Sequence, residues 1–186
     1  MRLACCLVLC LAFALGGCAT PRIVVLSDPL DAREHNDLGA SYEASGELDL
    51  ALGAYETAAA RDRSWDQPLI NLGNVHAALG DWKEAAASYR QALKRNPENP
   101  EAMNNLAFAQ TNLGQERDAL KWSAQALKIE PGNVLFKSTR ALVLSRTGEK
   151  AEALRLLDEA VRDLPGEDPL REEIIALRHR IARFAP

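Results

Sequence analysis

The chain has 186 residues, of which 47% are apolar but only 5% are aromatic, so a folded core must be built mainly from leucine and alanine. These two residue types favour helices over strands. The formal net charge of -4 argues against a nucleic-acid-binding protein, because such proteins normally present a basic face to the phosphates.

The first residues predict a secretory signal. Met1 and Arg2 are followed by an apolar run from Leu3 to Leu15, and the run ends in a Gly-Gly-Cys sequence at Cys18. A short positive region before such a run is typical of a signal peptide. The alternative is an uncleaved helical anchor, which we disfavour because a membrane-spanning helix needs about 20 apolar residues.

The four residues that end at Cys18 resemble the lipobox of bacterial lipoproteins. The resemblance implies a signal peptide over residues 1–17 and a covalent lipid on Cys18, with no other cofactor. Because Ala19 rather than Asp follows the cysteine, it also implies an outer-membrane lipoprotein that faces the periplasm. The other three cysteines leave with the signal, so no pair remains for a disulfide.

Residues 18–31 are expected to form a short tether between the lipid and the folded part. The segment can span at most about 45 Å when extended, which would hold the domain close to its membrane. Its apolar run from Ile23 to Leu26 resembles a strand, but we expect it to lie against the first helix rather than in a sheet.

Four glycines, Gly46, Gly80, Gly114 and Gly148, stand 34 residues apart, and two columns of alanine keep the same spacing. A fixed period of this size predicts a solenoid of stacked units. The repeats are expected over residues 32–165, with approximate units 32–65, 66–99, 100–133 and 134–167.

Each unit carries two helical patterns that flank the glycine. In the second unit, Leu72 and Val75 belong to an apolar stripe with spacings of three and four, and Tyr89 belongs to another after Gly80. We expect two amphipathic helices of about 13 residues, with Gly80 ending the first in a left-handed conformation and Asp81 capping the second.

This pattern resembles the tetratricopeptide repeat, whose columns in the second unit are Leu69, Leu72, Gly73, His76, Gly80, Ala85, Tyr89, Ala92 and Pro97. The resemblance implies an all-α fold, a right-handed superhelical solenoid of four helix pairs. Ser123 departs from an aromatic column and Arg140 from a leucine column. Arg140 is the more serious departure, because an unpaired buried guanidinium is costly.

Residues 168–186 are predicted to form a C-terminal capping helix. Asp168 and Pro169 make a favourable helix start, and an apolar stripe runs from Leu170 to Ile181. A terminal helix of this kind covers the apolar face that the last repeat would expose. Its arginines could contact anionic lipid, but we favour a solvated cap face.

The sequence offers no constellation for catalysis or metal binding, so we expect a protein that is not an enzyme. There is no HExxH, CxxC, GxSxG or glycine-rich phosphate loop, and His35 and His76 occupy packing columns of the repeat.

The resemblance implies instead a concave surface that binds a protein or peptide. The family's inward positions fall on Asn36, Asp37, Asn71, Asn74, Asn104, Asn105, Phe108, Ser138 and Leu142. Amides offer both donors and acceptors, so they can hold an extended peptide backbone. The alternative is that the asparagines are solvated surface. The lysines of a terminal-carboxylate clamp are missing, so we do not expect one.

These features together predict a lipid-anchored scaffold that binds proteins or peptides and supports assembly of an envelope complex, such as a pilus or secretion system. This hypothesis rests on fold-level analogy. The alternatives are an accessory subunit of a cell-wall hydrolase or peptidase, and an adaptor that self-associates through its convex face. The partner and the oligomeric state stay open.

Overall fold

The computed structural model describes residues 28–183 of the chain, which form nine helices and no strand. The predicted signal peptide, Cys18 and the run from Ile23 to Leu26 lie outside the described residues. The helices are α2 (Ala32–Ala44), α3 (Leu48–Arg61), α4 (Gln67–Leu79), α5 (Trp82–Arg95), α6 (Pro100–Asn112), α7 (Glu116–Ile129), α8 (Val134–Arg146), α9 (Lys150–Asp163) and α10 (Pro169–Arg183).

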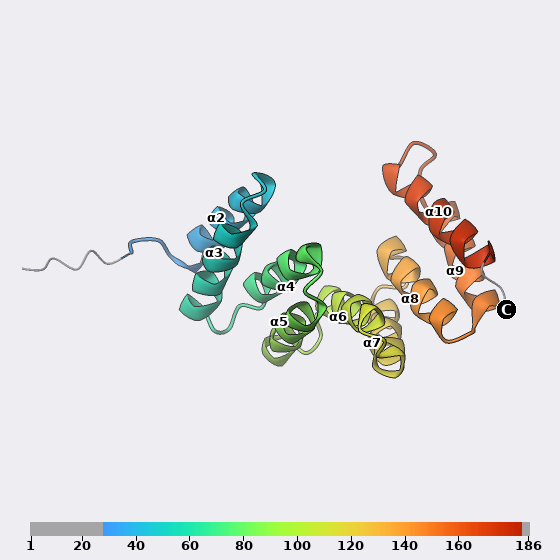
Figure 1. Ribbon diagram of the computed structural model, residues 1–186, viewed down its shortest axis with the longest axis horizontal. Coiled ribbons are helices and arrows are strands. Elements are labelled where there is room, and N and C mark those ends of the chain that lie inside the picture. Colours follow the sequence, from blue (N-terminus) through green and yellow to red (C-terminus); the bar gives the residue numbers. More distant parts are fainter. Residues whose placement is uncertain (1–27, 184–186) are drawn as a thin grey trace, which may run out of the picture.

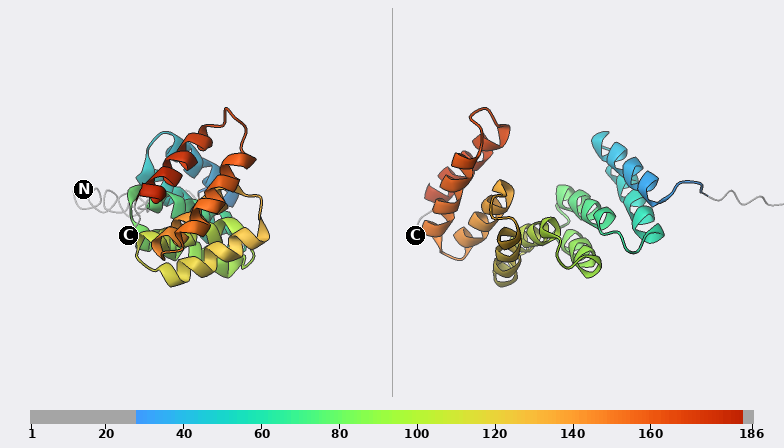
Figure 2. Two further views of the ribbon diagram at one scale, coloured as in Figure 1. Left: turned by 90° about the vertical axis from the view of Figure 1, so that its right-hand side faces the viewer. Right: turned by 180° about the vertical axis from the view of Figure 1, so that it is seen from behind.

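The helices pair in chain order and stack into an arch (Figure 1). Helices α4 and α6 lie on the inner side of the arch and α5 and α7 on the outer side, and Figure 2 shows the same curvature from behind. Contacts also run along the inner side, from α4 to α6, from α6 to α8 and from α8 to α10. The predicted all-α solenoid of four helix pairs with a terminal helix is therefore confirmed.

The turn inside each pair depends on a glycine. Gly80 ends α4 with a φ of 82°, a left-handed conformation that a Cβ atom would oppose, and the other three glycines of the column have φ values of 71° to 88°. The prediction for Asp81 was wrong in one respect. It stands at the first position before α5, but its side chain makes no capping hydrogen bond. Asp31 does cap its helix, because it and Glu34 form a reciprocal capping box at the start of α2.

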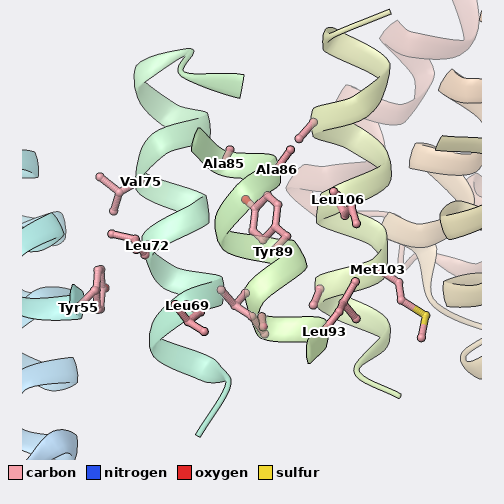
Figure 3. Packing of buried hydrophobic residues seen from close by; sticks show 14 of the residues in the cluster. Tyr55, Leu69, Leu72, Val75, Ala85, Ala86, Tyr89, Leu93, Met103 and Leu106 are labelled. Atoms are coloured by element: carbon pink, nitrogen blue, oxygen red, sulfur yellow. The ribbon is translucent and has the colours of Figure 1, made fainter. Parts of the chain in front are cut away.

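In the first two units, a glycine on the first helix faces a tyrosine on the second. A Cβ atom added to Gly73 would lie 2.4 Å from Cε1 of Tyr89, and one added to Gly39 would lie 2.6 Å from the same atom of Tyr55. Figure 3 shows Tyr89 packed among apolar side chains of α4, α5 and α6. The glycine is therefore required by the close approach of an aromatic ring.

The last two units replace this pair with smaller or aliphatic residues. Ala107 and Ser123 occupy the two columns in the third unit, and Ala141 and Leu157 occupy them in the fourth. All four residues are buried. The apolar core is also divided here. One cluster runs from the first unit to Phe136 on α8, a small one joins Ala107, Ala119 and Val143, and another joins the fourth unit to α10.

Arg140 is accommodated at the junction between the third and fourth units. Its Nη1 donates to the carbonyl oxygen of Leu120 at 2.7 Å and to Oγ of Ser123 at 3.2 Å, both on α7. The guanidinium is half-buried but paired, so the expected penalty does not arise. The two departures from the repeat pattern compensate each other, because a serine in an aromatic column supplies an acceptor for an arginine in a leucine column.

A second polar pair holds the fourth unit together. The Lys137 side chain is almost fully buried on α8, and its ammonium pairs with the carboxylate of Asp163 at the end of α9. The repeat places Leu69 and Met103 at the position of Lys137, so an apolar contact has been replaced by an ion pair.

Arginines also tie successive units together by binding helix C-termini. Arg95 donates to the carbonyl oxygens of Ala59, Asp62 and Trp65 at 2.9, 3.1 and 2.7 Å. Arg171 at the start of α10 donates in the same way to two carbonyls near the end of α9. A cation suits this place, because the last carbonyls of a helix lack partners within it and carry partial negative charge.

Over residues 28–183, none of the helices is long and apolar enough to cross a membrane.

Candidate functional site: the concave face

A ladder of side-chain amides crosses the junction between the first and second units. The Nδ2 group of Asn71 on α4 donates to Oδ1 of Asn36 on α2 at 2.9 Å. Oδ1 of Asn71 accepts from Nε2 of Gln67 at 3.0 Å. Both asparagines are half-buried. Part of their hydrogen-bonding capacity is therefore used within the protein, and one Nδ2–H of Asn71 is left for a ligand.

A similar contact crosses the junction between the second and third units. Nδ2 of Asn105 on α6 donates to Oδ1 of Asn74 on α4 at 3.0 Å, and the Tyr89 hydroxyl donates to the same oxygen at 2.8 Å. Burial, and then the carboxylate of Glu101, raise the pKa of the Tyr89 hydroxyl, which therefore stays protonated and acts as a donor. Tyr89 thus links the core to the inner surface.

Asn104 lies deeper than a groove residue should. It is only 7% exposed, its Nδ2 donates to Oδ1 of Asn105 at 3.1 Å, and its Oδ1 is buried without a partner among the described residues. The repeat places the fully buried Ile70 at the equivalent position. Asn104 therefore positions Asn105 more than it presents its own amide.

The remaining predicted groove residues differ in their exposure and in their contacts. Asp37 is exposed on α2, and Ser138 on α8 turns its hydroxyl back to the carbonyl oxygen of Val134. Phe108 is 38% exposed and packs edge-on against Trp82, with ring centroids 5.7 Å apart. Phe108 and Leu142 lie together on the walls of two hollows at the C-terminal end of the inner face, described next.

The first hollow, which we call the basic hollow, has a volume of about 510 Å³. Phe108, Leu142 and Ile181 provide apolar walls. Its cations are Arg146, Lys150 and Arg180, and its lining contains no carboxylate.

The second hollow, which we call the amide hollow, has a volume of about 420 Å³ and shares Phe108, Leu142 and Arg180 with the first. Asn105 and the single carboxylate Glu173 also line it. The two hollows thus form a continuous surface between α6, α8 and α10.

Carboxylates gather instead near the starts of α4 and α6. Burial, with the negative charges of Asp66 and Glu130, raises the pKa of Glu101 above its ordinary value. This region would repel an acidic ligand, in contrast to the basic hollow at the other end of α6.

Gln67, Tyr89 and the three cations of the basic hollow were not predicted as site residues from the sequence. The repeat period could have identified two of these cations, because Asn112, Arg146 and Arg180 stand 34 residues apart and all three line that hollow. Their convergence shows that α10 continues the register of α6 and α8 as a fifth inner helix. The prediction that α10 serves only as a cap was therefore incomplete.

The chemistry on this face is that of a binding surface. Over residues 28–183 there is no group of three or more His, Cys, Asp or Glu side chains that could hold a metal ion. The available groups are amides, cations and apolar side chains, which are suited to hold a polypeptide by hydrogen bonds, charge and packing.

Comparisons with known proteins agree with this geometry. The family profile described as "TPR repeat" matches residues 73–114, and that described as "Tetratricopeptide repeat" matches residues 135–159. The fold is a tetratricopeptide-repeat solenoid. A search of curated proteins found no match.

Solved structures of tetratricopeptide-repeat proteins resemble this chain over most of its length. A thermophilic protein from Thermus thermophilus, TTC0263, superposes with a TM-score of 0.70 at 21% identity, over 82% of this chain and 83% of that one. A protein from Parabacteroides merdae gives 0.68 at 22% identity, over 84% of this chain and 62% of that one. YrrB, described as "a TPR protein with an unusual peptide-binding site", gives 0.63 at 21% identity, over 81% and 86%. At these identities the likeness concerns the fold.

Proposed function

We propose that this tetratricopeptide-repeat solenoid is a scaffold that binds a segment of another protein along its concave face. The observation that carries the proposal is the inner surface itself, where amides cross two unit junctions and then give way to two open hollows. YrrB, a protein of the same fold, is described as having a peptide-binding site, which supports the proposal that this solenoid binds a peptide segment.

An extended segment would lie across the inner helices, with its backbone facing Asn71 and Asn105. Each net hydrogen bond contributes about 0.5 to 1.5 kcal/mol, so a few such bonds would give only weak binding. The hollows would supply the rest by burying side chains of the ligand. The amides would therefore set the direction of the bound segment, and the hollows would select its side chains.

We further propose that the protein is an outer-membrane lipoprotein that faces the periplasm and supports assembly of an envelope complex, such as a pilus or secretion system. The support is the lipobox-like sequence before Cys18 and the short tether that follows it. Two or more acyl chains would give stable anchoring. Confinement to a surface raises the effective concentration of a weak binder near partners in the same envelope.

The groove is tested by affinity capture from solubilised membranes. The wild-type protein would be compared with Asn71→Ala/Asn105→Ala and with a convex-face control, Arg90→Ala/Gln91→Ala. Circular dichroism would first show that both variants stay helical. We expect the groove variant alone to lose the specific partner. A partner list that is the same for all three proteins would contradict the use of the concave face.

The anchor is tested separately by fractionation. Cys18→Ala should move the protein from the membrane to the soluble fraction, because the acylated thiol is gone. Full retention of Cys18→Ala in the membrane would contradict lipid anchoring while leaving the groove proposal intact.

A further inference from the structure

The basic hollow differs from the rest of the inner face in charge. The chain as a whole carries a net charge of -4, yet three cations and no carboxylate line this hollow. Within residues 28–183, neither Arg146 nor Arg180 forms an ion pair, and both are exposed. Their guanidinium groups are therefore available to a ligand.

The hollow is held in shape by contacts at its base. Nζ of Lys150, at the start of α9, donates to the carbonyl oxygen of Ala182 near the end of α10 at 2.7 Å. Ile181 on the same turn of α10 is 7% exposed and belongs to the apolar cluster of the fourth unit. The wall formed by α10 is thus fixed to α9, and Arg180 projects from a packed element.

The apolar walls are suited to one bulky side chain. Phe108 is held edge-on by Trp82, and Leu142 lies one unit further along in the same column of the repeat. A volume of about 510 Å³ accommodates an aromatic or large aliphatic group and leaves the cations around it.

We propose that the basic hollow selects partner segments in which a bulky apolar side chain is flanked by Asp or Glu side chains. The proposal rests on the proposed function and names the partner chemistry that the concave face reads. The apolar group would insert between Phe108 and Leu142, and the flanking carboxylates would pair with Arg146 and Arg180. Arginine is well suited to this role, because its fork of N–H donors can bind a carboxylate through two bonds.

The positions of the three cations favour a ligand with several side-chain carboxylates over one with a single C-terminal carboxylate. Arg146 ends α8, Lys150 begins α9 and Arg180 lies near the end of α10, so the cations come from three different helices. Several carboxylates spaced along a segment match cations placed around a hollow. The amide hollow beside it can receive the continuing backbone, since Asn105 lies on its wall.

The test uses synthetic peptides that are acetylated and amidated, so that no terminal charge contributes. The probe has the core sequence Asp-Glu-Phe-Glu-Asp, and its two matched controls have Lys-Lys-Phe-Lys-Lys and Asp-Glu-Ser-Glu-Asp. Fluorescence anisotropy with the purified protein would give each affinity. We expect the probe to bind at least tenfold more tightly than either control, and its affinity to fall several-fold when salt is raised from 50 to 500 mM.

Charge reversal locates the site. Arg146→Glu/Arg180→Glu should lose at least tenfold in affinity for the probe, because attraction becomes repulsion. The matched control is Arg90→Glu/Arg117→Glu, which reverses two exposed arginines on outer helices α5 and α7 and should bind like the wild type. Equal affinity of the two double variants, or no preference for the probe over the controls, would overturn the proposal.

Two other outcomes would show whether the selectivity proposal fails alone or together with the scaffold function. If groove variants lose their membrane partner while the preference for the probe is absent, the scaffold function stands and this selectivity is wrong. If vesicles with anionic lipid bind the wild type but not Arg146→Glu/Arg180→Glu, and the probe does not bind, the cations recognise lipid and the proposal is overturned.

Discussion

The two halves of the solenoid are built by different physical means, although they share a repeat. In the first two units a tyrosine ring packs directly on a glycine, and amides bridge the inner face. In the last two units Ser123 and Leu157 take the place of the tyrosine, Arg140 bonds to Ser123, and the inner face opens into hollows. The N-terminal half therefore presents an inner surface of hydrogen-bonded amides, whereas the C-terminal half presents the hollows that we propose select the partner.

The largest effect is expected from Gly73→Ala. The new methyl group would lie 2.4 Å from Cε1 of Tyr89, so the ring or the helix must move. We expect a loss of about 1 to 3 kcal/mol in the free energy of unfolding, measured by urea denaturation followed by circular dichroism.

A double-mutant cycle shows whether the ring is the cause. In a Tyr89→Ser background, which imitates the third unit, Gly73→Ala should cost little or become favourable, because alanine suits a helix better than glycine. If Gly73→Ala lowered the free energy of unfolding equally in the wild-type and Tyr89→Ser backgrounds, the tyrosine ring would not be the reason for the glycine.

Arg140 tests the polar junction in the other half. Arg140→Ala should lower the free energy of unfolding by about 1 kcal/mol, because the hydrogen bonds to α7 and the packing of the side-chain stem are lost. Arg140→Leu should cost less, since it restores the apolar residue of the repeat column and replaces a half-buried cation by an apolar side chain. Thermal and urea denaturation would measure the free energy of unfolding of both variants. A larger loss for Arg140→Leu than for Arg140→Ala would contradict the prediction.

A smaller effect is expected at the N-terminal edge when the pH is lowered. The backbone amide of Leu30, with the side chains of His35 and Arg61, holds the pKa of Asp28 below its ordinary value. A carboxyl group with a depressed pKa contributes stability above its unfolded pKa of about 3.9, and that stability is lost as the pH falls through the folded pKa.

Asp28→Asn removes the ionisable carboxyl group but keeps the size and shape of the side chain. The variant should be slightly less stable than the wild type at pH 7, and the difference should shrink below pH 4. Melting temperatures across this range measure it, and a difference that stays constant with pH would show that ionisation of Asp28 is not involved.

The repeat period was sufficient to predict the helix pairs and the left-handed glycines. The terminal helix was predicted from its Asp168-Pro169 start and its apolar stripe. The period was not sufficient to predict how Arg140 is paired, since its partners lie on the preceding helix and are not at a repeat distance. The depth of Asn104 was not evident from the period either, because its column holds Asn36, Ile70 and Ser138, of which only Ile70 is apolar.

The groove residues were predicted as a set, but the set did not reveal which amides bind each other. Asn71 bonds to Asn36, whereas Asn105 in the same column bonds to Asn74. The choice depends on side-chain torsions and on the approach of neighbouring helices, which a linear pattern does not contain. For the basic hollow the period did align Arg146 with Arg180, but it did not indicate that Lys150 at the start of α9 would join them.

Site-specific photo-crosslinking in living cells tests the central claim most directly, that partners bind the concave face. The photoreactive residue p-benzoylphenylalanine would replace Phe108, which it closely resembles, or Arg90 on the outer helix α5. We predict that position 108 captures one defined envelope protein and that Arg146→Glu/Arg180→Glu abolishes this product, while position 90 captures none. Capture of that protein from position 90 but not from position 108 would contradict the account.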